Sequence, residues 1–143
     1  MTMIGTAEGT DTPAQEPRYA VYPEAFEVTG RSLQLTLGDR LCEAAMRKLK
    51  DPKAWKTMSY KELSKLLRDN CIGQDGYLSP QQPVLETAFR ILLTAPDGSL
   101  TLEEIHSRIA ELWMTSPWPR HISREALKRV LDNGHSYGIA PAG

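Results

Sequence analysis

Basic side chains gather in two parts of this sequence, and the chemistry open to them is contact with phosphate. The first group surrounds Trp55 and Tyr60, and its main members are Lys53, Lys56, Lys61 and Lys65. The second group lies nearer the C-terminus and consists of Arg120, Arg124, Lys128 and Arg129. Lysine and arginine neutralise nucleic-acid phosphates whatever the base sequence, and arginine also reads base edges in the major groove. These two groups are therefore the candidate nucleic-acid-binding residues.

Each group also has a plain structural interpretation. Charges on a helix usually form a solvated face, and Glu125 and Asp132 dilute the second group. An aromatic ring among lysines can stack on an unpaired base. For Trp55, the favoured interpretation is that it packs with Met58 in the core between two amphipathic helices.

The distribution of charge along the chain is more informative than the total. The 143 residues have a formal net charge of −1. Residues 31–70 contain ten Lys and Arg against five Asp and Glu, whereas residues 1–30 contain one against five and residues 71–143 contain six against eight. Only the middle third has the positive balance of a phosphate-facing surface, while the near-neutral total favours a protein partner.

A predicted loop at residues 113–119 contains two tryptophans, a methionine and two prolines. Large aromatic side chains often cover the core of a small domain, and Trp113 and Trp118 have this role in the favoured interpretation. Tryptophan and methionine are also enriched in protein interfaces. The alternative is that Trp113 and Trp118 anchor a protein partner.

No group of residues has the spacing of a catalytic or metal site. His106, His121 and His135 fall on separate elements, and no C-x-x-C or H-x-x-x-H pattern occurs. Cys71 lies at a predicted helix end without the context of a nucleophile, so packing explains it better. Glu104 is accounted for by a helix cap. The sequence therefore predicts a protein that is not an enzyme and needs no metal or cofactor.

The composition is that of a soluble globular protein, because 41% of the residues are hydrophobic and 24% are charged. No apolar run approaches the roughly 18 residues that cross a bilayer, and the N-terminus lacks the features of a signal peptide. Two cysteines, Cys42 and Cys71, do not make a disulfide framework. The expected compartment is therefore the reducing cytoplasm, without membrane association.

The N-terminal part is expected to begin with a tail and a small β-structure. Residues 1–17 lack apolar periodicity, which is typical of a disordered tail. Apolar residues alternate in 26–28 and 33–37 around a Thr-Gly-Arg-Ser turn, and this pattern predicts a short β-hairpin. Residues 19–22 would add an edge strand that ends at Pro23.

Two helices are expected to follow and to complete a basic unit over residues 18–72. Four-residue spacing of apolar side chains predicts a helix over 39–50. Ser59 and Glu62 form a capping box that opens a second helix, which runs to about residue 69. Residues 73–83, rich in Gly, Pro and Gln, are expected to form a linker or a long loop. Packing of the two halves against each other fits the sequence equally well, because neither half has much core alone.

Residues 84–143 are expected to form three helices around one short strand. The first helix covers residues 84–93 and ends at an Ala-Pro-Asp-Gly turn. An extended Ser-Leu pair then leads into a second helix, which has a capping box at Thr101 and Glu104. The third helix begins near Ser123 and ends at Asn133-Gly134, and residues 137–139 would form a short strand.

This part of the chain resembles a known superfamily. Residues 100–105 fit the pattern L-x-x-x-E-I, and residues 123–131 fit S-x-x-x-L-x-x-x-L. With these motifs, residues 84–139 resemble winged-helix domains and are especially similar to the N-terminal domain of the bacterial RNA polymerase delta subunit. The resemblance implies that the third helix meets DNA or a protein partner. Because the chain after Gly134 is too short for a full wing hairpin, we expect a wingless domain or one that borrows strands from the N-terminal hairpin.

The sequence thus predicts a mainly α protein with a small β-hairpin and a winged-helix-like C-terminal domain. The leading functional hypothesis is a DNA-binding transcription regulator or accessory factor, whose partner is double-stranded DNA. Proteins of this kind commonly form homodimers that read two half-sites. The alternative is an adaptor or phage-type modulator that binds protein, such as an RNA polymerase, through residues 113–118 and the edge of the N-terminal hairpin.

Overall fold

The computed structural model describes residues 16–142, and most of these residues are helical. In chain order the elements are β2 (Arg18–Val21), α2 (Glu24–Thr29), α3 (Leu33–Gly38), α4 (Glu43–Arg47), η2 (Ala54–Thr57), α5 (Tyr60–Asn70), α6 (Val84–Leu93), β3 (Ser99–Thr101), α7 (Leu102–Trp113), α8 (Arg124–Asp132), η3 (His135–Tyr137) and β4 (Ile139–Pro141). The prediction of a mainly α protein with little β-structure is therefore confirmed.

The three strands form one antiparallel sheet in the order β3-β2-β4. Tyr19 of β2 pairs with Leu100 on one side and with Pro141 on the other, so segments far apart in sequence meet in this sheet. The predicted strand at residues 19–22 is present, but its predicted place at an edge is wrong. Three consecutive residues of β2 are buried, which is the pattern of a strand covered on both faces.

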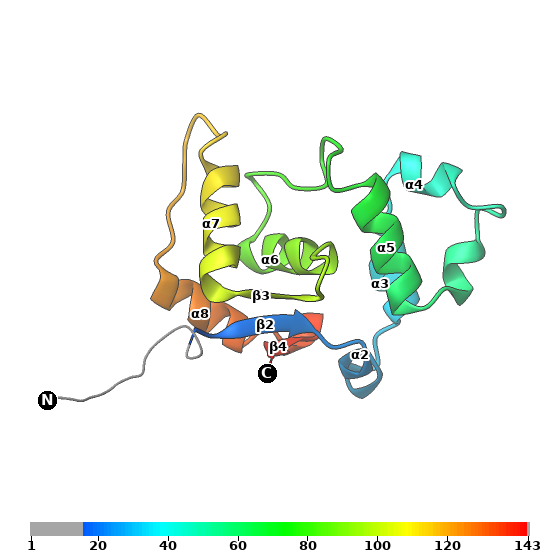
Figure 1. Cartoon of the computed structure of the whole chain (residues 1–143), viewed down its shortest axis with the longest axis horizontal. Coiled ribbons are helices and arrows are strands. Elements are labelled where there is room, and N and C mark those ends of the chain that lie inside the picture. The colour runs from blue at the N-terminus through cyan, green and yellow to red at the C-terminus, as the bar shows by residue number, and fades with distance from the viewer. Residues whose placement is uncertain (1–15, 143) are drawn as a thin grey trace, which may run out of the picture.

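The helices α6, α7 and α8 lie with the sheet at one end of the molecule, and α3, α4 and α5 lie at the other end (Figure 1). Local caps begin α5, α7 and α8 where the sequence predicts them. Reciprocal capping boxes join Ser59 to Glu62 and Thr101 to Glu104, and Ser123 accepts the amide of Ala126 at 3.0 Å. The backbone amide of Thr101 also lowers the pKa of the Glu104 carboxyl.

The predicted hairpin at residues 26–28 and 33–37 is wrong, because the chain forms α2 and α3 there. Leu35 is 55% exposed, whereas Leu37 is fully buried and Leu33 is half-buried. The buried pair is four residues apart, as on one face of a helix, so the alternation of leucines was misleading. Gly30, with φ of 72°, ends α2, and Ser32 caps α3.

The predicted helix over 39–50 is also shorter than expected. The apolar spacing that suggested it is divided between two helices, since Leu37 belongs to α3 and Ala45 to α4. Cys42 is extended, with ψ of 169°, and caps α4. Near the C-terminus, Tyr137 lies in η3, so the predicted strand at 137–139 begins two residues later, at Ile139.

Cys42 and Cys71 are paired as a disulfide, with their Cα atoms 5.5 Å apart. The prediction that the two cysteines make no disulfide framework did not anticipate this bond. The pairing depends on how the start of α4 packs against the end of α5, and sequence spacing alone does not reveal it. The disulfide closes a loop that contains α4, η2 and α5. The cytoplasmic location, which rested on unpaired cysteines, stays a prediction.

The chain that enters the sheet is held by specific contacts. Leu102 donates its amide to the Pro17 carbonyl at 2.8 Å, and Glu103 donates its amide to the Glu16 carboxylate at 3.0 Å. The predicted disorder of residues 1–17 is wrong for these last two residues, and residues 1–15 lie outside the described part. Within residues 16–142, no helix has the length and apolar character that a membrane crossing requires.

Candidate nucleic-acid and partner interface

The two groups of basic residues lie at opposite ends of the molecule (Figure 1). Arg120, Arg124, Lys128 and Arg129 form the α8 surface, on or just before α8. The other group belongs to the lysine lobe, which we define as residues 43–70 with α4, η2 and α5. The structure therefore does not join the predicted cations into one surface.

Within the α8 surface, Arg120 is held by internal contacts. Its guanidinium donates to the carbonyls of Pro80 and Gln82 at 2.8 and 2.9 Å. The same guanidinium lies 4.1 Å from the ring centroid of Trp113. Cation–π and hydrogen-bond contacts of this kind fasten the loop after α7 to residues 80–82. The contacts of Arg120 thus resemble those of a structural residue.

Two further cations of the α8 surface are paired with carboxylates. Arg124 bonds to Glu16 at 2.9 Å and to Glu103 at 3.1 Å. Lys128 bonds to Asp132 at 2.7 Å, and together with the Tyr19 hydroxyl it lowers the pKa of Asp132. Arg129 is exposed and has no ion pair among residues 16–142. To bind phosphate, most cations of this surface would therefore have to give up the carboxylates or carbonyls that they contact now.

The helix α8 itself is positioned by a narrow apolar face. Leu127 and Leu131 are fully buried, whereas Lys128 and Arg129 are exposed on the remaining surface. Asn133 and Gly134 end the helix, as predicted. A Cβ on Gly134 would lie 3.0 Å from Cβ of Ile139, so α8 and β4 meet closely at this glycine.

The lysine lobe has a larger excess of unpaired positive charge. Its residues include eight Lys and Arg against four Asp and Glu. Arg47 pairs with Glu43, and Lys65 pairs with Asp69 at 2.5 Å, a bond that lowers the pKa of Asp69. Five exposed lysines have no carboxylate partner in the described part of the chain: Lys48, Lys50, Lys53, Lys56 and Lys61.

The lobe presents these lysines because its apolar residues face inward. Leu63 and Leu67 of α5 are fully buried. Trp55 and Met58 are half-buried and pack against the core, as favoured from the sequence. The Trp55 ring lies directly over Gly38, since a Cβ there would be 2.7 Å from Cε3 of the ring.

The predicted loop at residues 113–119 begins one residue later in the structure, because Trp113 is the last residue of α7 and Trp118 lies in the loop that follows. Trp113 is only 3% exposed, and its indole N–H has no hydrogen-bond partner among the described residues. Trp118 and Met114 are 85% and 68% exposed. The favoured interpretation, core packing, thus holds for Trp113 and is wrong for Trp118, which remains the candidate partner anchor.

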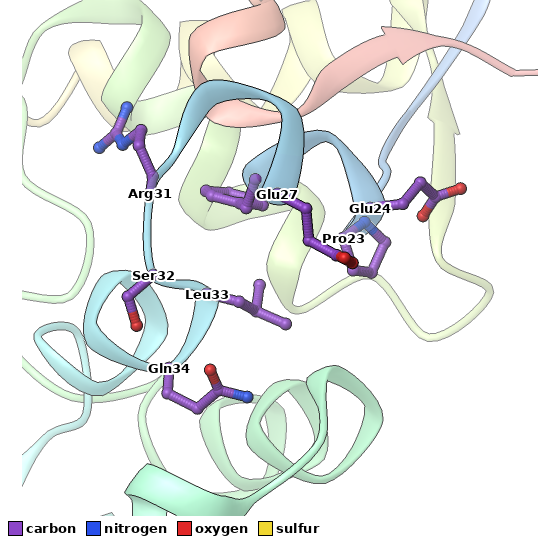
Figure 2. Close-up of a pocket in the computed structure, with 8 residues that line it drawn as sticks. Pro23, Glu24, Glu27, Arg31, Ser32, Leu33 and Gln34 are labelled. Carbon is purple, nitrogen blue, oxygen red and sulfur yellow. The ribbon is translucent and has the colours of Figure 1, made fainter.

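A hollow of about 490 Å³ lies between α2 and α3, where sequence reasoning expected a hairpin turn. Figure 2 shows Glu27, Leu33 and Gln34 beside this space and Arg31 turned away from it. Arg31 donates to the Ser136 carbonyl at 2.6 Å. The lining contains two exposed carboxylates and no histidine or cysteine.

One cluster of charged residues is nearly buried and was missed by the sequence analysis. Glu86 accepts hydrogen bonds from Arg40, Arg90 and the Tyr137 hydroxyl, at 2.7 to 2.9 Å. Burial opposes ionisation of Glu86, but the bonds from Arg40, Arg90 and Tyr137 outweigh it and lower the pKa of the carboxyl to about 2. A carboxylate held in this way is a structural link and a poor general base. The sequence signal for this cluster is a Glu and an Arg four residues apart in a mainly apolar helix.

Among residues 16–142, no group of three or more His, Cys, Asp or Glu side chains is placed to hold a metal ion. Comparison with protein-family models, curated proteins and solved structures gives no match for this chain.

Proposed function

We propose that this protein is a non-enzymatic DNA-binding regulator or accessory factor of transcription. The observation that carries the proposal is the lysine lobe, with five exposed lysines that lack a carboxylate partner among the described residues. Such lysines release condensed counterions when they meet phosphates, and this release drives binding that does not depend on base sequence. The excess of positive charge is local, so the near-neutral total does not oppose it.

A winged-helix-like unit forms the other part of the proposal. The order α6, β3, α7, α8 and β4 supports it, and β2 supplies a strand that a wing hairpin would otherwise have to provide. In this unit α8 would be the third helix, which meets DNA or a partner in the superfamily that the sequence resembles. Because Arg124 and Lys128 already have carboxylate partners, we assign the larger share of affinity to the lysine lobe.

The test is fluorescence anisotropy of a labelled mixed-sequence duplex of about thirty base pairs, titrated at about 50 and about 200 mM salt. We expect micromolar binding that weakens steeply with salt. The double variant Lys53→Glu with Lys56→Glu should weaken binding at least tenfold, on the order of 1.4 kcal/mol. The matched double variant Lys128→Glu with Arg129→Glu makes the same change of charge at the opposite end, and should have a smaller effect.

Two results would contradict the proposal. Absence of duplex binding at low salt would remove double-stranded DNA as a partner. A larger loss from the α8 variant than from the lysine-lobe variant would keep DNA as the partner but move the main contact to α8.

A second candidate function has one observation in its favour. Trp118 and Met114 present apolar surface on one loop, and exposed apolar side chains of this size are typical of protein interfaces. An adaptor that binds RNA polymerase should lose its partner in a pull-down when Trp118 is changed to Ala, and should keep it in the Lys53→Glu, Lys56→Glu variant. The reverse pattern would exclude this candidate.

A further inference from the structure

A second hollow, of about 340 Å³, lies between α3 and η2 at the edge of the lysine lobe. Its lining residues are Ser32, Gln34, Leu35, Trp55 and Lys56. It differs from the larger hollow of Figure 2, which lies on the α2 side of Ser32 and Gln34 and has the carboxylates of Glu24 and Glu27 in its lining. No carboxylate lines the hollow beside Trp55, so a negatively charged ligand meets no repulsion there.

The apolar part of this hollow is a fixed aromatic ring beside an exposed leucine. Leu35 is 55% exposed, although the rest of α3 packs inward through Leu37. The Trp55 ring cannot move toward α3, because it already contacts Gly38 at the distance that only glycine allows. The half-buried Trp55 ring and Leu35 thus give the hollow an apolar lining.

The polar part supplies a cation, an acceptor and a hydroxyl. The Lys56 ammonium lies 5.7 Å from the centroid of the Trp55 ring. Gln34 donates its amide to the Met58 carbonyl at 3.1 Å, which leaves its side-chain oxygen as an acceptor. The Ser32 hydroxyl accepts the Leu35 amide at 3.1 Å and keeps its own hydrogen to donate.

We infer that this hollow receives an unpaired base of single-stranded nucleic acid, whose phosphates run along the lysine lobe. The inference rests on the proposed function and makes it more specific. A flat base matches an aromatic platform, and base–aromatic stacking tolerates any sequence. In a duplex the faces of the bases are covered by their neighbours, so a duplex offers Trp55 nothing to stack on. The lysine lobe therefore prefers single strands to duplexes.

The experiment uses the intact chain and two labelled probes, oligo(dT) of about fifteen nucleotides and a duplex of the same length, in low salt. We expect oligo(dT) to bind about tenfold more tightly than the duplex, since one stacked base contributes that order of affinity. In a Trp118→Phe background, which removes the exposed tryptophan, oligo(dT) should quench the fluorescence of Trp55. Trp113 is buried and should contribute a constant signal.

Three variants separate stacking from charge. Leu35→Ala removes part of the apolar lining and should weaken oligo(dT) binding several-fold, with duplex binding unchanged. Val28→Ala is the matched control, because Val28 is 88% exposed on α2 and does not line the hollow. Gly38→Ala would displace the Trp55 ring without changing any charge, and it should also act on oligo(dT) alone. Circular dichroism and thermal unfolding establish that each variant is folded.

The possible results are distinct. Equal binding of oligo(dT) and duplex, with no quenching of Trp55 and no effect of Leu35→Ala, would overturn this inference and leave the DNA-binding proposal intact. Absence of binding to either probe would overturn both. Selective loss of oligo(dT) binding in the Leu35→Ala and Gly38→Ala variants would establish the inferred site.

Discussion

The Arg40 guanidinium bonds to both carboxylate oxygens of Glu86, with N–O distances of 2.9 and 2.8 Å. Arg40 lies between α3 and α4, and Glu86 lies in the first turn of α6. The two side chains are only 12% and 14% exposed. Arg90 and Tyr137 complete the coordination of the same carboxylate. The Glu86 side chain therefore joins the segment between α3 and α4, the helix α6 and the short helix η3.

Removal of the Glu86 charge should be strongly destabilising. Glu86→Gln leaves Arg40 and Arg90 nearly buried without a counter-charge, and we expect a loss of about 3 kcal/mol in the free energy of unfolding. The control is Glu43→Gln, because Glu43 is 84% exposed in its pair with Arg47 and should cost less than about 1 kcal/mol. Urea unfolding followed by circular dichroism measures both. Similar small losses in the two variants would show that the buried cluster contributes little.

The same carboxylate should make stability depend on acid. The pKa of Glu86 is about 2 in the folded protein, against 4.5 for an ordinary glutamate. A lowered folded-state pKa means that the stabilisation is fully present above pH 4.5 and is lost as the pH falls toward 2. We expect the melting temperature to fall across this window, and to fall less in the Glu86→Gln variant. Parallel curves for the two proteins would contradict this assignment.

Reduction of the disulfide between Cys42 and Cys71 should destabilise the lysine lobe. The pair is separated by 29 positions, and the loop-entropy model assigns about 3.6 kcal/mol to a loop of this size. We expect dithiothreitol to lower the melting temperature of the protein. It should not change the melting temperature of a Cys42→Ser, Cys71→Ser variant, which has no disulfide to reduce. Mass spectrometry after thiol labelling checks the pairing. Two labelled cysteines in the untreated protein would show that it is absent.

The two tryptophans around the loop after α7 should respond very differently to mutation. Trp113→Ala opens a cavity in the core and removes the ring on which Arg120 lies, so a loss of about 3 to 5 kcal/mol is expected. Trp118→Ala should change stability by less than about 0.5 kcal/mol, because the side chain is 85% exposed. Chemical denaturation of the two variants measures the difference. A large loss in Trp118→Ala would place that ring in the core and remove it as a partner anchor.

The parts of the fold that sequence reasoning predicted correctly are those held by local interactions. Ser59 with Glu62, and Thr101 with Glu104, meet within one helical turn, so their capping boxes follow from four consecutive residues. The apolar spacing of α6 and the end of α8 at Asn133 have the same local origin. For this reason the bounds of α5, α6, α7 and α8 lie close to their predicted places.

The predictions were wrong where contacts with a distant segment select one of two local structures that the sequence allows. The leucines at 33, 35 and 37 fit a strand or a helix, and burial of Leu37 with exposure of Leu35 selected the helix. The strand β2 is central because β3 and β4, which lie about 80 and 120 positions away in sequence, pair with it on both sides. The pairing of Cys42 with Cys71 likewise required α4 and α5 to pack together.

For the interaction surfaces, the sequence alone determined which side chains are basic and how many there are, because charge is a property of composition. The tertiary structure decided which of them are available. It placed the two basic groups at opposite ends of the molecule (Figure 1), and gave Arg124 and Lys128 carboxylate partners while five lysines of the lobe received none among the described residues. The physical reason is that pairing and convergence depend on distances of a few ångströms between side chains, and packing of distant segments sets those distances.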